Sequence, residues 1–567
     1  MSKTKKNIIY NFLYNLLVLI VPLITAPYLA RVIGADGIGI YSYTLSIAQY
    51  FVLFAMLGLA NYGNRSIAKV RDKRKRLSKE FFSIYKMQLI SSSISILIYV
   101  IFILINNSYS DYFLIQLIYL ISVLFDISWF FFGMEKFKLT VTRNTIIKIL
   151  STICIFVFVR SSNDLPIYVM IMAISTLLSQ MLLWPFLLKE VDYCKVTFKD
   201  VKKHIKPNLK LFIPVIAISL YNIMDKIMLG VLCGTKEVGY YANAEKIVQI
   251  PVTLIGSLGT VMLPKISNLV SKRSSKKIKE YIKKSVYLVM FMAIPIFVGL
   301  LLVGRDFSII FYGSNFEVTG LLIQVLSVII VIKLLANIIR TQYLIPHEKD
   351  KVYIISVCLG AVINLILNLI LIPSLRAMGA SIGTIAAELA VMFYQMIKSE
   401  KELKIVEYLK DSIGFVIKAA IMGIVVYLIG LLNINTVIRL LLQAFVGAGL
   451  YFALNIEFIK SEILNKKKPK TKANSKKKEI VETKKVDIKK ILKIVFKYLI
   501  IVLAVVSFVL IYLFIKKLDI VPDKYLNLFF IIETSVLAVS IILILFKKKV
   551  LTIISLVLAI LILNCTY

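Results

Sequence analysis

The stretch RVIGADGIGIYSY at residues 31–43 returns as VLCGTKEVGYYAN at residues 231–243. The two copies align without a gap at one constant offset. The identical pairs are Gly34 with Gly234, Gly39 with Gly239, and Tyr41 with Tyr241. Each copy lies between two long apolar runs, and glycine permits the positive φ that a tight turn needs. The repeat therefore predicts the same turn in two related halves of the chain.

Composition decides the class of protein to which these halves belong. The chain has 567 residues, 59% of them hydrophobic, and a mean hydropathy of +0.85. Soluble domains are roughly 45–50% apolar. Apolar runs of about 20 residues, the length that spans the hydrocarbon of a bilayer, recur along the chain. They are continuous rather than alternating, which favours helices over strands. We therefore predict an all-α polytopic membrane protein.

The apolar runs predict fourteen spans in a core that ends near residue 460. They lie at 8–30, 38–62, 81–105, 112–133, 143–160, 165–188, 210–232, 238–262, 285–304, 318–339, 353–372, 378–398, 411–432 and 436–457. Three further spans follow at 494–515, 525–546 and 549–564.

The net charge of +38 is arranged for topology rather than for nucleic acid. Lys and Arg gather in alternate connections, such as 65–80, 195–206 and 271–284, whereas the intervening connections are short and nearly uncharged. This is the positive-inside pattern, which predicts a cytoplasmic N-terminus and basic loops that contact anionic lipid. We expect no nucleic-acid partner.

The repeat indicates how the core is organised. Six spans separate the two Gly/Tyr stretches, so both enter the membrane in the same direction, as in a parallel repeat. A second echo pairs FFGMEKFK at 131–138 with LIPHEKDK at 344–351. We predict two six-helix bundles in parallel repeat, spans 13–14, and three extra C-terminal transmembrane helices. The expected divisions are 1–207, 208–400, 401–460, a Lys-rich cytoplasmic linker at 461–490, and a three-helix membrane extension at 491–567.

Four stretches resemble a known family. The opening NFLYNLLVLIVPLITAPYLARVIGADGIGIYSY, DISWFFFGMEKFK, DKIMLGVLCGTKEVGYYANAEKI and LIPHEKDK are similar to bacterial polysaccharide transporters and oligosaccharide flippases of the multidrug/oligosaccharidyl-lipid/polysaccharide exporter superfamily. The resemblance implies a flippase that moves undecaprenyl-pyrophosphate-linked oligosaccharide repeat units to the outer leaflet of the bacterial cytoplasmic membrane by alternating access. The three spans after residue 490 depart from the family's pattern.

Such a substrate needs cations and polar groups inside the membrane. Ionisable residues there cost about 2.5–3.5 kcal/mol each on insertion scales, so they should face a cavity or a partner. Spans 1, 2, 7 and 8 line the cavity in the superfamily, as the resemblance implies, whereas Lys333 is selected by its mid-span position alone. The expected substrate-binding residues are Arg31, Asn222, Lys226, Glu245 and Lys333, and the expected ion-coupling residues are Asp225 and Glu388.

Each candidate has a simpler alternative. An interhelical salt bridge or a snorkelling side chain also explains a charge in a span. For Lys246 a functional role and one of these simpler explanations fit the sequence equally well. For Lys418 a snorkelling side chain fits better, because this residue lies near a span end.

Other function classes fit less well. The scattered cysteines indicate neither disulfides nor a metal site, and the chain has no phosphate-binding P-loop, so we expect no cofactor. Short loops, with both His204 and His347 predicted to be cytoplasmic, argue against an enzyme. A multidrug or cation exporter of the same superfamily remains the alternative, although the lysines favour an anionic substrate. The Lys-rich segment 465–490 either contacts anionic lipid or docks a polysaccharide polymerase or glycosyltransferase.

Overall fold

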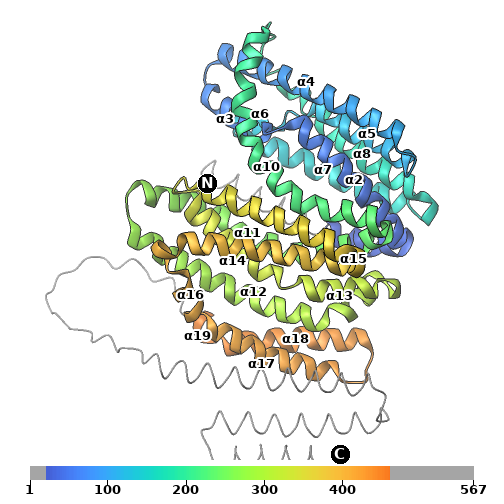
Figure 1. Ribbon diagram of the computed structural model, residues 1–567, viewed down its shortest axis with the longest axis vertical. Helices are drawn as coiled ribbons and strands as arrows, with labels where there is room; N and C mark the ends of the chain where they lie inside the picture. Colours follow the sequence, from blue (N-terminus) through green and yellow to red (C-terminus); the bar gives the residue numbers. More distant parts are fainter. Residues whose placement is uncertain (1–20, 460–567) are drawn as a thin grey trace, which may run out of the picture. The chain divides into compact units, whose positions relative to one another are not determined.

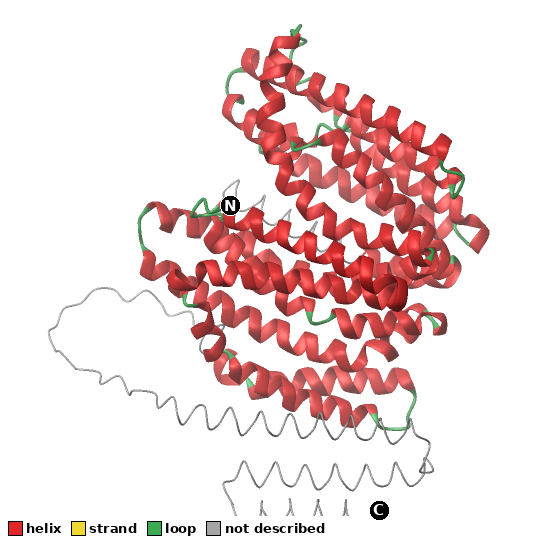
Figure 2. Ribbon diagram, viewed as in Figure 1, coloured by secondary structure: helices red, strands yellow, loops and turns green. Residues whose placement is uncertain are grey.

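The computed structural model of the protein describes residues 21–459. Within that range every regular element is a helix, as Figure 2 shows. The three expected C-terminal spans and the Lys-rich segment lie outside the described residues.

The first half runs from the helix Val21–Val32 through a series of antiparallel helices (Figure 1). These are α2 (Gly34–Met56), α3 (Leu59–Val70), α4 (Arg74–Ile105), α5 (Ser110–Ile121), α6 (Ser128–Gly133), α7 (Phe137–Phe158), α8 (Leu165–Met181) and α9 (Trp184–Leu187), with short 3-10 turns at Ser122–Phe125 and Ser162–Asp164.

The rest of the described chain contains several longer helices. Its elements are α10 (Phe198–Cys233), α11 (Thr235–Ser271), α12 (Ser275–Tyr312), α13 (Glu317–Leu326), α14 (Ile329–Ile339), the π-helical turn η4 (Arg340–Leu344), α15 (Asp350–Leu403), α16 (Ile405–Asp411), α17 (Ile413–Gly430), α18 (Thr436–Leu454) and α19 (Ile456–Phe458), with a 3-10 turn at Ser314–Phe316 before α13.

The predicted all-helical membrane architecture is confirmed. Ten described helices are long and apolar enough to cross a bilayer, and α13 with α14 and η4 forms an eleventh candidate, bent by 43°. The expected span at 210–232 falls on α10, and the described part of the first expected span is Val21–Val32. The two spans expected at 353–372 and 378–398 are joined in α15, where Arg376 (φ 51°, ψ −132°) breaks the helix.

The two repeated motifs form matching turns. Gly34 and Gly234 both adopt positive φ, at 69° and 90°; Gly34 is the first residue of α2 and Gly234 directly precedes α11. In the second echo Glu135 and Glu348 share a φ of 56°, and the following Lys136 and Lys349 each donate a backbone hydrogen bond to the carbonyl five residues earlier. That is the 6→1 hydrogen bond of a Schellman motif at a helix C-terminus. The similar sequences at 131–138 and 344–351 therefore adopt the same backbone conformation.

Candidate functional site

Asp225 of α10 is the most deeply buried acidic residue in the described part of the chain, with 2% exposure. Its carboxylate accepts hydrogen bonds from the Tyr241 hydroxyl of α11 (2.7 Å), the Thr384 hydroxyl of α15 (2.5 Å) and the Asn368 amide of α15 (2.6 Å). Among the described residues no Lys or Arg lies within 4.0 Å of it. The hydrogen-bond partners of this buried carboxyl group are therefore all neutral donors.

Two lysine–glutamate ion pairs lie one helical turn from the Asp225 ligands. Lys226 of α10 pairs with Glu245 of α11 at 2.7 Å, and Lys333 of α14 pairs with Glu388 of α15 at 3.1 Å. Both lysine side chains are about one-fifth exposed, at 21% and 22%, whereas Glu388 is only 5% exposed.

These groups form one unit, which we call the charge cluster: Asp225, Lys226, Glu245, Lys333 and Glu388. Tyr241 and Glu245 are one turn apart on α11, and so are Thr384 and Glu388 on α15. Glu245 and Asp225 also act electrostatically on Lys333. Four helices of the second half thus bring together five of the seven residues that the sequence predicts for the site.

The two remaining candidates stand apart. Arg31 is exposed and donates to the carbonyl oxygens of Pro27 (3.1 Å) and Ile310 (2.7 Å), so it is engaged at the C-terminal end of α12, where the helix dipole favours a cation. Asn222 lies in α10, but its side chain is outside the described set.

Lys246 occupies a different position from its neighbour Glu245. It lines a small cavity of about 170 Å³ between the helix Val21–Val32, α11 and the end of α12, together with Pro22, Ala26 and Tyr312. The described residues place no carboxylate within 4.0 Å of its ammonium group. Its amino group therefore lies at the boundary between the first helix and the second half, apart from the two ion pairs.

Sequence reasoning missed the amide and hydroxyl ligands of Asp225. Asn364 and Asn368 are one turn apart in an otherwise apolar span, and Asn368 donates to both Asn364 (3.2 Å) and Asp225. Two amides at that spacing inside a span are a signal that could have identified the pair, because buried polar groups need partners.

The Gly/Tyr repeat brings the backbones of α2 and α11 into direct contact. A Cβ atom on Gly39 would lie 1.8 Å from the Thr235 carbonyl oxygen, and one on Gly239 would lie 1.9 Å from the Ala35 carbonyl oxygen. The contacts are related by the offset of the repeat, so α2 and α11 cross backbone to backbone about a local two-fold. Asp36 accepts a hydrogen bond from Thr235 at 2.5 Å beside this crossing.

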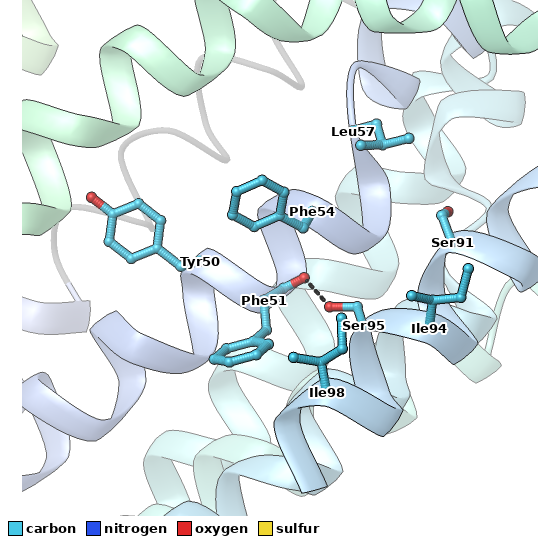
Figure 3. A pocket seen from close by; sticks show the side chains of 8 residues that line it. All are labelled: Tyr50, Phe51, Phe54, Leu57, Ser91, Ile94, Ser95 and Ile98. Atoms are coloured by element: carbon cyan, nitrogen blue, oxygen red, sulfur yellow. Dashed lines mark hydrogen bonds between the residues drawn. The ribbon is translucent and has the colours of Figure 1, made fainter. Parts of the chain in front are cut away.

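A separate pocket of about 530 Å³ lies along α2 and α4 (Figure 3). Tyr50, Phe51 and Phe54 line one side, and Ser91 and Ser95 face them from α4. Both serine hydroxyls donate to carbonyl oxygens of α2, at 2.6 Å and 2.7 Å. The pocket is apolar and has no charged lining residue, so it does not suit an anionic group. No group of three potential metal ligands occurs in residues 21–459.

Comparison with known proteins agrees with this architecture. A family model described as "Polysaccharide biosynthesis protein" matches residues 4–270, and one described as "MatE" matches residues 211–370. Relatives named "Putative O-antigen transporter" from Shigella dysenteriae and Escherichia coli (strain K12) are each 24% identical; the alignments cover 70% and 68% of this chain and 100% and 94% of the relatives.

A solved structure of the lipid II flippase MurJ in an inward closed conformation has the same fold. It superposes with a TM-score of 0.65 at 18% identity, over 81% of this chain and 99% of that one. The expectation that the chain is a membrane transporter and not an enzyme is confirmed by these relatives. The chain is thus similar to polysaccharide transporters and flippases of the multidrug/oligosaccharidyl-lipid/polysaccharide exporter superfamily.

Proposed function

We propose that this protein is a flippase for lipid-linked oligosaccharides. Its substrate would be an undecaprenyl-pyrophosphate-linked repeat unit, moved from the inner to the outer leaflet of the bacterial cytoplasmic membrane for cell-surface polysaccharide assembly. The names of the full-length relatives support a polysaccharide precursor as cargo. The observation that carries the proposal within this chain is the pair of partly exposed lysines, Lys226 and Lys333, inside the membrane-spanning half.

The proposed chemistry is electrostatic. A diphosphate carries its charge into a region where an unpaired anion is costly, and ammonium groups offset that cost. Lys226 and Lys333 would bind the diphosphate, while the Gly39–Gly239 crossing separates during alternating access to release the glycan on the other side. Arg31 and Asn222 remain proposed contributors to the same path.

The proposed orientation places the N-terminus in the cytoplasm. It rests on the alternation of basic and uncharged connections. The basic connection 271–284 would then face the cytoplasm, and the Gly34 and Gly234 turns would face outward. Polymerases or glycosyltransferases are proposed partners on the side that supplies or receives the repeat unit.

We further propose that Asp225 is the ion-coupling group. One carboxylate surrounded by a phenol, a hydroxyl and amides suits a single monovalent cation or a proton, since a divalent ion would need more negative charge. Glu388, the other expected coupling residue, already holds a lysine, so Asp225 fits this role better.

The decisive experiment measures the leaflet distribution of undecaprenyl-linked sugar in cells that lack the protein. Accumulation of the sugar-bearing carrier on the cytoplasmic side, relieved by the wild type but not by Lys333→Ala, is the expected result. Relief by both proteins would retain the flippase and remove Lys333 from the binding site.

A multidrug or cation exporter is the second candidate function. The "MatE" match covers residues 211–370, which include four of the five members of the charge cluster, and two of these, Asp225 and Glu245, are carboxylates that could receive a cation. Cells without the protein would then show altered sensitivity to cationic drugs and no accumulation of the sugar-bearing carrier.

A further inference from the structure

The lysines of the charge cluster are not free cations. In the described structure each already holds a carboxylate, Glu245 for Lys226 and Glu388 for Lys333. Both pairs are formally neutral, and Asp225 adds a third carboxylate nearby. A cavity built to present standing positive charge would leave the lysines without such partners, so the pairing itself needs a functional account.

We infer that Glu245 and Glu388 are resident counterions that an anionic substrate displaces from Lys226 and Lys333; this inference rests on the proposed function. Without substrate the glutamates keep both lysines neutralised, because an unpaired charge in a low-dielectric interior is strongly unfavourable. When a diphosphate enters, one anion replaces another at each lysine, so the net charge around the ammonium group is conserved during the exchange.

The solvent exposure of the lysines allows an anion to reach them, and the different exposure of the two glutamates makes one easier to displace than the other. Each lysine is about one-fifth exposed and can be approached from solvent, and Glu245, at 34% exposure, returns to water when it is displaced. Glu388, at 5% exposure, has little access to water. Displacing Glu388 therefore costs more than displacing Glu245, and Glu388 limits the affinity for the anion.

A salt bridge that only holds helices together predicts the opposite behaviour. Removing the glutamate charge from such a pair leaves a lysine uncompensated and loosens the site. Removing the charge of a resident counterion eliminates a competitor and strengthens the binding of an anion. The sign of the change in affinity therefore separates the two roles.

The experiment measures the dissociation constant of undecaprenyl diphosphate, without sugar, for the full-length purified protein. Glu388→Gln is expected to bind the probe roughly threefold to tenfold more tightly than the wild type, the range set by a partly exposed ion pair. Glu245→Gln should bind it more tightly by a smaller factor. The matched control is Glu402→Gln, because Glu402 lies on the same helix and pairs with Lys349 at 2.5 Å outside the charge cluster; its affinity should not change.

The outcomes separate the inference from the function on which it rests. If the wild type binds the probe and both cluster variants bind it equally or more weakly, the counterion role is wrong and the flippase proposal stands. If neither the wild type nor any variant binds it, both proposals fail. Melting temperatures measured without ligand identify any variant that does not fold. If Glu388→Gln does not fold, the test rests on Glu245→Gln. Tighter binding by Glu245→Gln then supports the inference, and unchanged or weaker binding overturns it.

Discussion

Tyr41 and Tyr241 occupy equivalent positions in the repeat but contact different kinds of side chain. Tyr241 donates to Asp225, whereas the ring of Tyr41 packs edge-on against Tyr168 with a centroid separation of 4.8 Å. At the same offset the first half has Thr25 where the second has Asp225. The buried acid therefore belongs to one half only, and two similar halves can perform different tasks.

This asymmetry predicts unequal effects of one substitution. Tyr241→Phe removes a donor to a buried carboxylate and should lower the free energy of unfolding by about 1–3 kcal/mol. Tyr41→Phe, the matched control in the other half, should cost clearly less. Thermal unfolding of both variants in detergent measures the difference, and equal losses would contradict the role given to the Tyr241 hydroxyl.

His204 is a second buried titratable residue, near the start of α10 and outside its expected span. Its ring nitrogens meet the Tyr62 hydroxyl (2.6 Å) and the Ser83 hydroxyl (2.8 Å), and Ser83 itself donates to the Glu80 carbonyl oxygen. This pattern fits a neutral ring that accepts from Tyr62 and donates to Ser83. Burial lowers the pKa of His204 below that of an exposed histidine.

The lowered pKa gives a signed prediction for stability. The unfolded chain binds a proton at His204 below about pH 6.5, where the folded protein resists protonation, so the unfolded state takes up more protons. Stability is therefore at its full value above this pH and falls as the pH drops through it. The melting temperature of His204→Gln should decrease less between pH 7.5 and 5.5 than that of the wild type; parallel curves would show that His204 is not the titrating group.

At the scale of elements, the crossing of α2 and α11 depends on two residues without side chains. Gly39 and Gly239 allow backbones to touch, as small residues do between transmembrane helices. Neighbouring contacts hold the same end together, including Asp36 with Thr235 and Glu237 with the backbone N–H of Ala377 at 3.3 Å. The break at Arg376 thus gives α15 a second helical start, and Glu237 accepts from one of its backbone donors.

The crossing predicts a strong response to a single methyl group. Gly39→Ala places a Cβ atom where the Thr235 carbonyl oxygen now lies, so α2 and α11 must move apart. We expect a loss of stability of roughly 1–3 kcal/mol from overpacking, together with loss of transport. Gly449→Ala in α18 is the control, because its Cβ would meet no atom within 4 Å, and alanine there should be neutral or slightly stabilising. Similar melting temperatures for the two variants would mean that the crossing is not tight.

At the scale of the whole molecule, the alternation of basic connections predicts which ends of the helices face the cytoplasm. Ser162 lies exposed in a connection without a net positive charge, and Ser275 lies exposed at the start of α12 in a basic one. A membrane-impermeant thiol reagent applied to intact cells should label Ser162→Cys and leave Ser275→Cys unlabelled, whereas broken cells should show labelling of both. The reverse pattern would invert the proposed topology and the direction of transport with it.

The sequence by itself determined the helical membrane class, the position of the core spans, the repeat and the resemblance to polysaccharide transporters. These properties depend on short stretches of sequence or on overall composition. An apolar run of bilayer length must be helical. A residue with positive φ at the boundary of a helix produces the same short sequence pattern in both halves of the chain. Residues such as Lys333 and Asp225 could be singled out because charge inside a span is rare.

Only the tertiary structure decided which residues meet. Lys333 and Glu388 are distant in sequence and on different helices, and Asp225 takes its ligands from α11 and from both parts of α15. Arg31, selected for the cavity, instead contacts carbonyl oxygens at a helix end. Hydropathy and spacing describe one helix at a time, whereas pairing depends on how helices rotate and pack against one another, and that is a property of the assembled bundle.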